Sequence, residues 1–202
     1  MIEADIRVKS FGGAPVLRDI RFRVATGEVL AILGPSGIGK STLLRIVAGI
    51  DSAFEGTVAR PERLSMAFQE PTLLPWRTVA ENLTLVHPSL GREGAVAALA
   101  RVGIEDRADL FPRQLSLGQQ RRVALARAFA GDPEALILDE PFASLDPATA
   151  DEMLALTEGL IAGSRPATIF VTHSEPEAAR LATRILRLGG RPATIRPDKE
   201  AG

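Results

Sequence analysis

The nine residues at positions 34–42, GPSGIGKST, combine the residue types that bind a phosphate chain. They fit the pattern G-x-x-x-x-G-K-[ST], in which glycines let successive backbone amides turn toward an anion. The lysine would place a positive charge at the β- and γ-phosphates, and the serine hydroxyl would be a ligand for Mg²⁺. The members of this predicted phosphate loop are Gly34, Pro35, Ser36, Gly37, Ile38, Gly39, Lys40, Ser41 and Thr42.

Two adjacent carboxylates, Asp139 and Glu140, directly follow the apolar run at 135–138. Buried carboxylates need cations or hydrogen bonds nearby, and the carboxyl ends of strands are where α/β sheets bind ligands. Beside a phosphate loop, we expect Asp139 to orient Mg²⁺ through its water shell and Glu140 to act as a general base on water. A surface turn before Pro141 is the structural alternative.

His173 occupies a similar position, because it follows the apolar run at 167–172. A histidine at the carboxyl end of a strand next to the carboxylate strand could reach the γ-phosphate. The alternative is a structural histidine whose ring is satisfied by neighbouring groups.

These side chains need a strand, a loop and a helix to position them. The apolar residues 29–33 predict a strand before the phosphate loop, and residues 43–49 predict a helix after it. Alternating residues at 2–9 and 17–24, joined by Gly12 and Gly13, predict two antiparallel strands. Phe11 precedes that turn; from its position alone we expect a core or turn aromatic rather than a platform for a ligand.

Several helix starts carry capping residues. Ser116 with Gln119, and Thr78 with Glu81, fit the capping box. Asp146 is an expected N-cap before Pro147. In the helix after Ser116, an ordinary solvated face would account for the arginines Arg121, Arg122 and Arg127.

Composition limits the class of protein. The 202 residues carry a net charge of −1 and no cysteine, so nucleic acid is a poor first guess for a partner and disulfides are excluded. Charged residues and prolines interrupt every apolar stretch, so we expect no segment that spans a bilayer. The first residues lack the pattern of a signal peptide, so no export is indicated. Leu73, Leu74 and Trp76 lie in a proline-bracketed segment that either meets a partner or folds back on the core.

In the order of its motifs the chain resembles the ATP-binding subunits of ABC transporters over nearly its whole length. GPSGIGKST resembles the Walker A loop, LSLGQQ at 115–120 the signature, and LILDE at 136–140 the Walker B strand. Gln69 resembles the Q-loop glutamine, SLD at 144–146 the D-loop, and His173 the switch histidine. Within the family, FQEPTLLPWRTVAENL at 68–83 is most similar to subunits that energise nitrate, sulfonate and taurine importers.

The resemblance implies an α/β P-loop NTPase domain over residues 1–202, with a mainly parallel core sheet, an antiparallel β subdomain and a helical subdomain over roughly 73–133. It implies that Phe11 stacks on adenine, that Gln69 touches Mg²⁺ and the attacking water, and that His173 contacts the γ-phosphate. ATP and Mg²⁺ are the implied ligands. Ser116, Gly118 and Gln119 are implied to close over ATP held by a second copy of the chain.

The resemblance also implies partners and a place in the cell. The segment containing Leu73 and Trp76 would receive a transmembrane permease subunit at the cytoplasmic face of the membrane, and a solute-binding protein would act indirectly. Leu117 departs from the usual glycine of the signature, and we expect hydrolysis to survive. A soluble ABC-type ATPase, acting as a nucleic-acid clamp or as a regulatory nucleotide-binding subunit, is the alternative; a small P-loop kinase is weaker, because no phosphoryl-acceptor pocket is indicated.

Overall fold

The computed structural model describes residues 1–196, which form two compact units that we describe separately. The first unit contains residues 1–64, 134–140 and 165–196. The second contains residues 65–133 and 141–164. The strand β5 (Leu64–Ala67) carries the chain from the first unit into the second.

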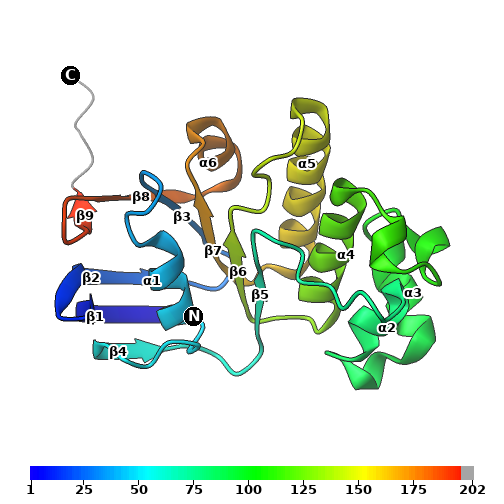
Figure 1. The fold of residues 1–202 in the computed structure, drawn as a ribbon, viewed down its shortest axis with the longest axis horizontal. Helices are drawn as coiled ribbons and strands as arrows, with labels where there is room; N and C mark the ends of the chain where they lie inside the picture. Colours follow the sequence, from blue (N-terminus) through cyan, green and yellow to red (C-terminus); the bar gives the residue numbers. More distant parts are fainter. Residues whose placement is uncertain (197–202) are drawn as a thin grey trace. The chain divides into compact units, whose positions relative to one another are not determined.

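An antiparallel sheet in the first unit has the strand order β2-β1-β4 (Figure 1). Its strands are β1 (Ile2–Phe11), β2 (Ala14–Val24) and β4 (Glu55–Ala59). Gly12 and Gly13, with φ of 55° and 82°, form the turn between β1 and β2, where a left-handed backbone matches the twist of the strands. The predicted antiparallel pair is therefore confirmed, with Phe11 paired to Ala14 beside the turn.

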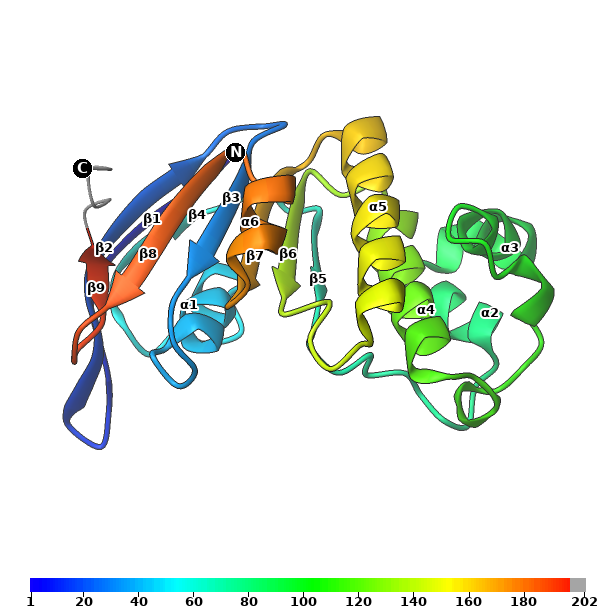
Figure 2. The same ribbon diagram turned by 90° about the horizontal axis from the view of Figure 1, so that it is seen from above.

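The core sheet of the first unit contains β6, β7, β3, β8 and β9 in that order (Figure 2). The first four are parallel and the last pair is antiparallel. Every residue of β3, β6 and β7 is buried, which explains their continuous apolar sequences. The bounds are β3 (Val29–Leu33), β6 (Ala135–Asp139), β7 (Ala167–Thr172), β8 (Arg184–Gly189) and β9 (Thr194–Arg196).

Two helices accompany this sheet. The helix α1 (Lys40–Val47) contacts β6, and α6 (Glu175–Leu181) contacts β3 and β7. Because β3, β6 and β7 are parallel neighbours, their carboxyl ends lie at one edge of the sheet. The sheet order thus brings the residues after three separate strands together, although they are far apart in the sequence.

The second unit is mainly helical, with α2, α3 and α4 in mutual contact and α4 also contacting α5. Its α-helices are α2 (Val79–Thr84), α3 (Gly91–Ala100), α4 (Leu117–Ala130) and α5 (Pro147–Ser164). Short 3₁₀ turns occur at Pro88–Leu90, Glu105–Arg107 and Pro112–Gln114. The predicted capping boxes at Thr78 and Ser116 are confirmed, and Asp146 Oδ1 accepts from the Thr149 amide.

The expectation of a solvated arginine face on α4 is wrong. Arg121 is 7% exposed, and its Nη1 donates to the Pro141 carbonyl at 2.8 Å. Arg127 donates to the carbonyl oxygens of Pro71 and Thr72. These arginines meet backbone oxygens brought from elsewhere in the second unit, a role that helical periodicity cannot reveal.

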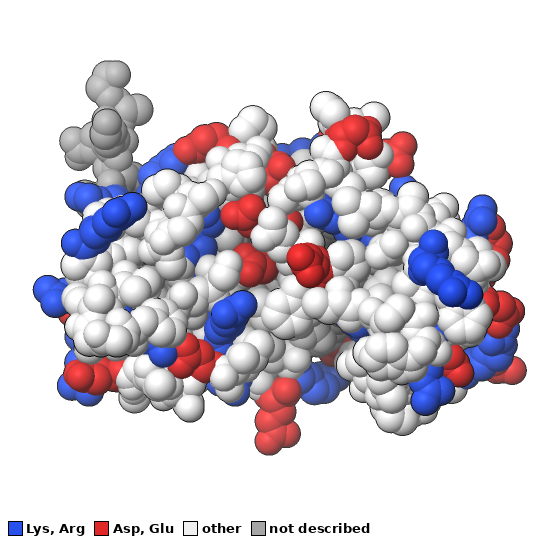
Figure 3. All heavy atoms as spheres, in the orientation of Figure 1, with Lys and Arg blue, Asp and Glu red and all other residues white. Residues whose placement is uncertain are grey.

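Charge is mixed on the face drawn in Figure 3, where lysine and arginine side chains are interspersed with aspartate and glutamate. Over the part of the chain that the structure describes, none of the helices combines the length and the apolar character needed to cross a bilayer.

Candidate functional site

The phosphate loop joins β3 to α1 with a backbone that depends on glycine. Gly37 and Gly39 have φ of 74° and 112°, in the left-handed region that other residues rarely adopt. A Cβ on Gly39 would lie 2.8 Å from Cδ2 of Leu17, so this position also requires the absence of a side chain. The loop therefore approaches β2 closely at Leu17.

The start of α1 offers unsatisfied backbone amides. Its N-cap, Gly39, has no side chain to accept from them, and no acidic residue lies in the first turn. The helix dipole adds partial positive charge at the same place. The residues present fit a phosphate group, because the glycine loop and the free amides both favour an anion.

Lys40 is 5% exposed and lies inside the loop. Its Nζ donates to the carbonyl oxygens of Gly34 at 2.7 Å and Pro35 at 3.2 Å. Nζ also lies 3.5 Å from Oε1 of Glu140. The ammonium is thus held at the centre of the predicted phosphate site and faces a carboxylate from a different strand.

Asp139, at the end of β6, faces the first turn of α1. The Ser41 hydroxyl donates to Oδ1 of Asp139 at 3.3 Å. Burial raises the pKa of Asp139 above its usual value of 3.8; the hydrogen bond from Ser41 opposes this rise, whereas the charge of Glu140 adds to it. A buried carboxylate with a hydroxyl beside it is an oxygen donor set that suits a hard cation such as Mg²⁺.

No group of three His, Cys, Asp or Glu side chains that could hold a metal occurs among residues 1–196. Mg²⁺ commonly takes only one or two protein carboxylates and completes its shell with phosphate oxygens and water. The pair formed by Ser41 and Asp139 fits that mode of binding.

Glu140 and His173 meet at the same edge of the sheet. Oε2 of Glu140 lies 3.3 Å from Nδ1 of His173, while the imidazole remains 59% exposed. The Glu140 amide donates to the Val171 carbonyl at 3.0 Å, and Glu140 has a φ of 45°. This left-handed conformation is strained for a side chain larger than glycine and is a recurrent feature of functional sites.

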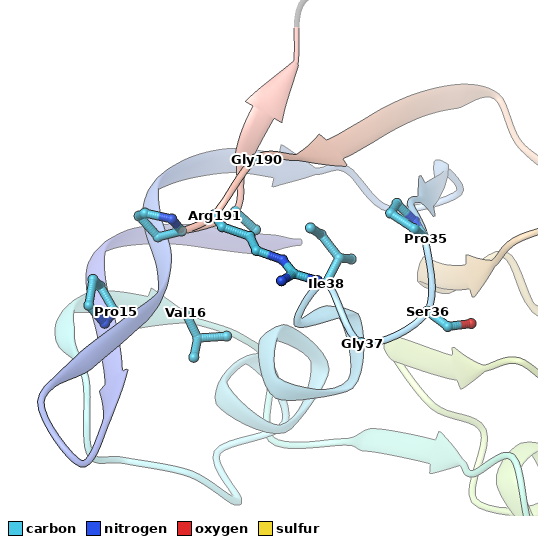
Figure 4. A pocket seen from close by; sticks show the side chains of 10 residues that line it. Pro15, Val16, Pro35, Ser36, Gly37, Ile38, Gly190 and Arg191 are labelled. Atoms are coloured by element: carbon cyan, nitrogen blue, oxygen red, sulfur yellow. The ribbon is translucent and has the colours of Figure 1, made fainter.

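A hollow of about 520 Å³ borders the outer side of the phosphate loop (Figure 4). Pro15 and Val16 of β2 line one side, and Gly190 and Arg191 in the turn after β8 line another. Arg191 and Ile38 extend toward the same space in Figure 4. The walls combine apolar and polar surface, and residues 35–38 of the phosphate loop complete them.

The remaining predicted site residues are placed as follows. Phe11 lies at the end of β1 in the first unit and is 53% exposed. In the second unit, Gln69 is an exposed residue after β5, and Ser116 is the exposed N-cap of α4. The Gln119 amide donates to Ser116 Oγ at 3.3 Å, and Gly118 packs so closely that a Cβ would meet Thr149 Cγ2 at 3.1 Å.

The structure therefore brings together Lys40, Ser41, Asp139, Glu140 and His173 within the first unit. Gln69 and the signature residues belong to the second unit. Sequence reasoning missed Lys9, which is 3% exposed and lies over the Phe11 ring. Its signal was a lysine two residues from Phe11 in a strand, which places both side chains on one face.

Comparisons with known proteins agree with this geometry. Residues 17–143 match the family model described as "ABC transporter". The aliphatic sulfonates import ATP-binding protein SsuB 3 of Paraburkholderia xenovorans (strain LB400) is 47% identical over 193 residues, which cover 94% of this chain and 78% of that protein. The SsuB 2 protein of Frankia alni (strain DSM 45986 / CECT 9034 / ACN14a) is 48% identical over 181 residues, covering 89% and 74%.

Solved structures are similar as well. The ATP-binding cassette MJ0796, solved as a dimer in a post-hydrolysis state bound to ADP and Pi, has a TM-score of 0.85 and 28% identity, and the match covers 100% of both chains. A second dimeric structure of MJ0796 has a TM-score of 0.80 and 29% identity over 93% of this chain and 94% of that one. The chain therefore belongs to the ABC transporter family, as an ATP-binding cassette that hydrolyses ATP.

Proposed function

We propose that the chain energises an importer of aliphatic sulfonates from the cytoplasmic face of the cell membrane. The proposed catalysis of ATP hydrolysis is supported mainly by the position of Glu140, which lies between the Lys40 ammonium and the His173 imidazole. The names of the SsuB relatives support the choice of aliphatic sulfonates.

The phosphates of ATP are held by the loop at 34–42. Lys40 exchanges its bonds to the carbonyl oxygens of Gly34 and Pro35 for bonds to the β- and γ-phosphates, because an ammonium binds an anion more strongly than a neutral carbonyl. The nucleoside lies along the hollow at Val16 and Ile38, and adenine stacks on the exposed ring of Phe11.

Ser41 and Asp139 would hold Mg²⁺, and Gln69 is proposed as a further oxygen ligand. Bound there, Mg²⁺ neutralises charge on the phosphate oxygens. Asp139 becomes fully ionised beside the cation, which offsets the effect of burial on its pKa.

Glu140 accepts a proton from the attacking water, and His173 orients the Glu140 carboxylate through Nδ1 and contacts the γ-phosphate. The reaction yields ADP and phosphate. The left-handed backbone at Glu140 supports this role, because it fixes the carboxylate at the edge of the sheet beside Lys40 and His173.

The site is completed by a second copy of the chain. Ser116, Gly118 and Gln119 of that copy close over the γ-phosphate, where the partial positive charge at the start of α4 favours the anion. ATP thus joins two subunits, and hydrolysis separates them. The chain acts as one ATPase domain, in which the helical subdomain over roughly 73–133 carries the signature.

The permease subunits dock on the segment that contains Leu73 and Trp76. Trp76 is 69% exposed, so it is not part of the core of its unit. A solute-binding protein outside the membrane delivers the sulfonate to the permease, and nucleic acid has no part in the cycle.

The test is transport by a reconstituted sulfonate permease in proteoliposomes. With the wild-type chain and ATP we expect uptake of radiolabelled ethanesulfonate, and with Glu140→Gln we expect none. Trp76→Ala should retain ATP binding by the free chain and lose assembly with the permease. ATP hydrolysis without any sulfonate uptake would contradict the proposed transport role.

A further inference from the structure

Lys9 is a buried cation beside an exposed aromatic ring. Its side chain is 3% exposed, although it lies near the end of a strand that leads to a solvent-exposed turn. Nζ donates to Asp51 Oδ1 at 2.8 Å and to the Ala53 carbonyl at 2.8 Å, and it lies 2.7 Å from Asp51 Oδ2. The ammonium therefore has a defined position, set by two partners in the connection between α1 and β4.

The same ammonium lies over the ring of Phe11, 4.6 Å from its centroid. A cation within about 6 Å of an aromatic face is attracted by the ring quadrupole. The Phe11 side chain is 53% exposed beside the β1–β2 turn, so its neighbours restrain its rotamer less than they would in a close-packed core. Lys9 thus restrains a ring that would otherwise lose entropy when a ligand stacked on it.

Asp51 connects this arrangement to the phosphate site. The Asp51 amide donates to the Arg45 carbonyl of α1 at 3.1 Å, and Asp51 Oδ1 accepts from the Ala53 amide at 3.0 Å. The hydrogen bond from Lys9 lowers the pKa of Asp51, so this carboxylate stays ionised. Phe11 is therefore tied through Lys9 and Asp51 to the helix whose first residues form the phosphate loop.

A β-bulge in the β1–β2 hairpin places Val16 in the same part of the hairpin as Phe11. The β1–β2 register shifts between Lys9, opposite Leu17, and Ser10, opposite Pro15, which leaves Val16 as the extra residue. Val16 lines the hollow beside the phosphate loop. The same short hairpin therefore supplies a wall of the hollow and the restrained ring.

We propose that Lys9 is a positioning residue for the base of the nucleotide. It holds Phe11 as a preformed stacking surface at a fixed place relative to α1, and Asp51 holds Lys9. The ammonium also draws the π-electron density of the ring toward itself, which favours stacking of an electron-rich purine on the other face. This inference rests on the proposed stacking role of Phe11.

The experiment compares two ligands of the purified full chain by isothermal titration calorimetry with Mg²⁺. ATP uses the base and the phosphates, whereas tripolyphosphate has no base. Lys9→Met should weaken ATP binding about fivefold and leave tripolyphosphate binding unchanged. Lys9→Arg, which keeps the cation, should bind ATP within about twofold of wild type.

A double-mutant cycle with Phe11→Ala separates the two proposals. In the Phe11→Ala background, adding Lys9→Met should cause no further loss of ATP affinity. A further loss, or an equal loss for tripolyphosphate, would overturn the positioning role. If Phe11→Ala leaves ATP affinity unchanged, the stacking role itself is wrong, and the inference falls with it.

The variant Asp51→Asn provides a second route if Lys9→Met does not fold. It removes the charge that holds the ammonium but keeps the side-chain shape, so we expect a smaller loss for ATP and none for tripolyphosphate. Unchanged affinity for both ligands in folded Asp51→Asn and Lys9→Met would contradict the proposal.

Discussion

Oε1 of Glu140 lies 3.5 Å from Nζ of Lys40, so the carboxylate after β6 faces the ammonium at the start of α1. The two residues are 100 positions apart in the sequence and meet because β6 and β3 lie in one parallel sheet with β7 between them. A base for water and a cation for phosphate are thereby held at adjacent positions. This arrangement suits the transfer of a phosphoryl group to water.

Glu140→Gln should reduce ATP turnover by about 10²- to 10⁴-fold, because an amide cannot accept the proton of the attacking water. ATP affinity should change little, since Lys40 and the loop amides remain. Release of phosphate and calorimetric binding measure the two quantities. Glu134→Gln, an exposed carboxylate just before β6, is the matched control and should retain turnover. Equal turnover in the two variants would exclude Glu140 as the base.

Asp139→Asn should raise the free energy of unfolding at neutral pH by about 1 kcal/mol, because an ionised buried carboxylate is replaced by a neutral amide. The raised pKa of Asp139 means that the folded chain binds this proton more tightly than the unfolded chain. The carboxylate therefore costs stability as pH rises from its usual value of 3.8 through the raised pKa.

Urea unfolding between pH 4 and pH 8 tests this for the chain without added Mg²⁺. The difference in stability between Asp139→Asn and wild type should grow with pH over that window and then level off. A constant difference at every pH would contradict the assigned pKa shift. The same variant should lose the dependence of ATP affinity on Mg²⁺.

Ser116 has a structural role that can be separated from its proposed role at the nucleotide. Ser116→Ala should lower the free energy of unfolding by about 1 kcal/mol, because the N-cap of α4 is lost. Ser116→Asp keeps a capping oxygen and should preserve stability, but it places a negative charge against the γ-phosphate of the other subunit. Its ATP turnover should therefore fall more than tenfold. Normal turnover in a stable Ser116→Asp chain would contradict the shared site.

Arg121→Ala should lower the free energy of unfolding by about 2 kcal/mol, because it leaves the Pro141 carbonyl unpaired and opens a cavity. The exposed Arg101, at the end of α3, is the control, and its replacement by alanine should change stability by less than about 0.5 kcal/mol. Chemical denaturation measures both variants. Equal effects would show that the Arg121 hydrogen bond contributes nothing measurable.

The sequence predicted well those elements whose structure is determined by residues close together in the chain. The capping residues Ser116, Thr78 and Asp146 act within three residues, so their patterns are readable directly. The buried strands β6 and β7 were readable because both faces are apolar. The predicted loop and carboxylates follow the strands that the structure shows, and their roles stay predictions.

The features that could not be predicted from the sequence depend on contacts between segments that are distant along the chain. Arg121 is buried because Pro141 presents a carbonyl to it, and Lys9 is buried because Asp51 and Ala53 surround its ammonium. Neither partner follows from helical or strand periodicity. The left-handed backbone of Glu140 was also unpredictable, since glutamate has no local preference for it.

In the proposed cycle, Ser116 of a second chain encloses the ATP that is bound by the first. Light scattering at saturating ATP and Mg²⁺ can detect this enclosure as a dimer of Glu140→Gln. The double variant Glu140→Gln, Ser116→Arg is measured beside it as the control. We expect twice the mass of one chain for Glu140→Gln and the mass of one chain for the double variant, with both samples binding ATP. A monomer of Glu140→Gln loaded with ATP, or an unchanged dimer in the double variant, would contradict it.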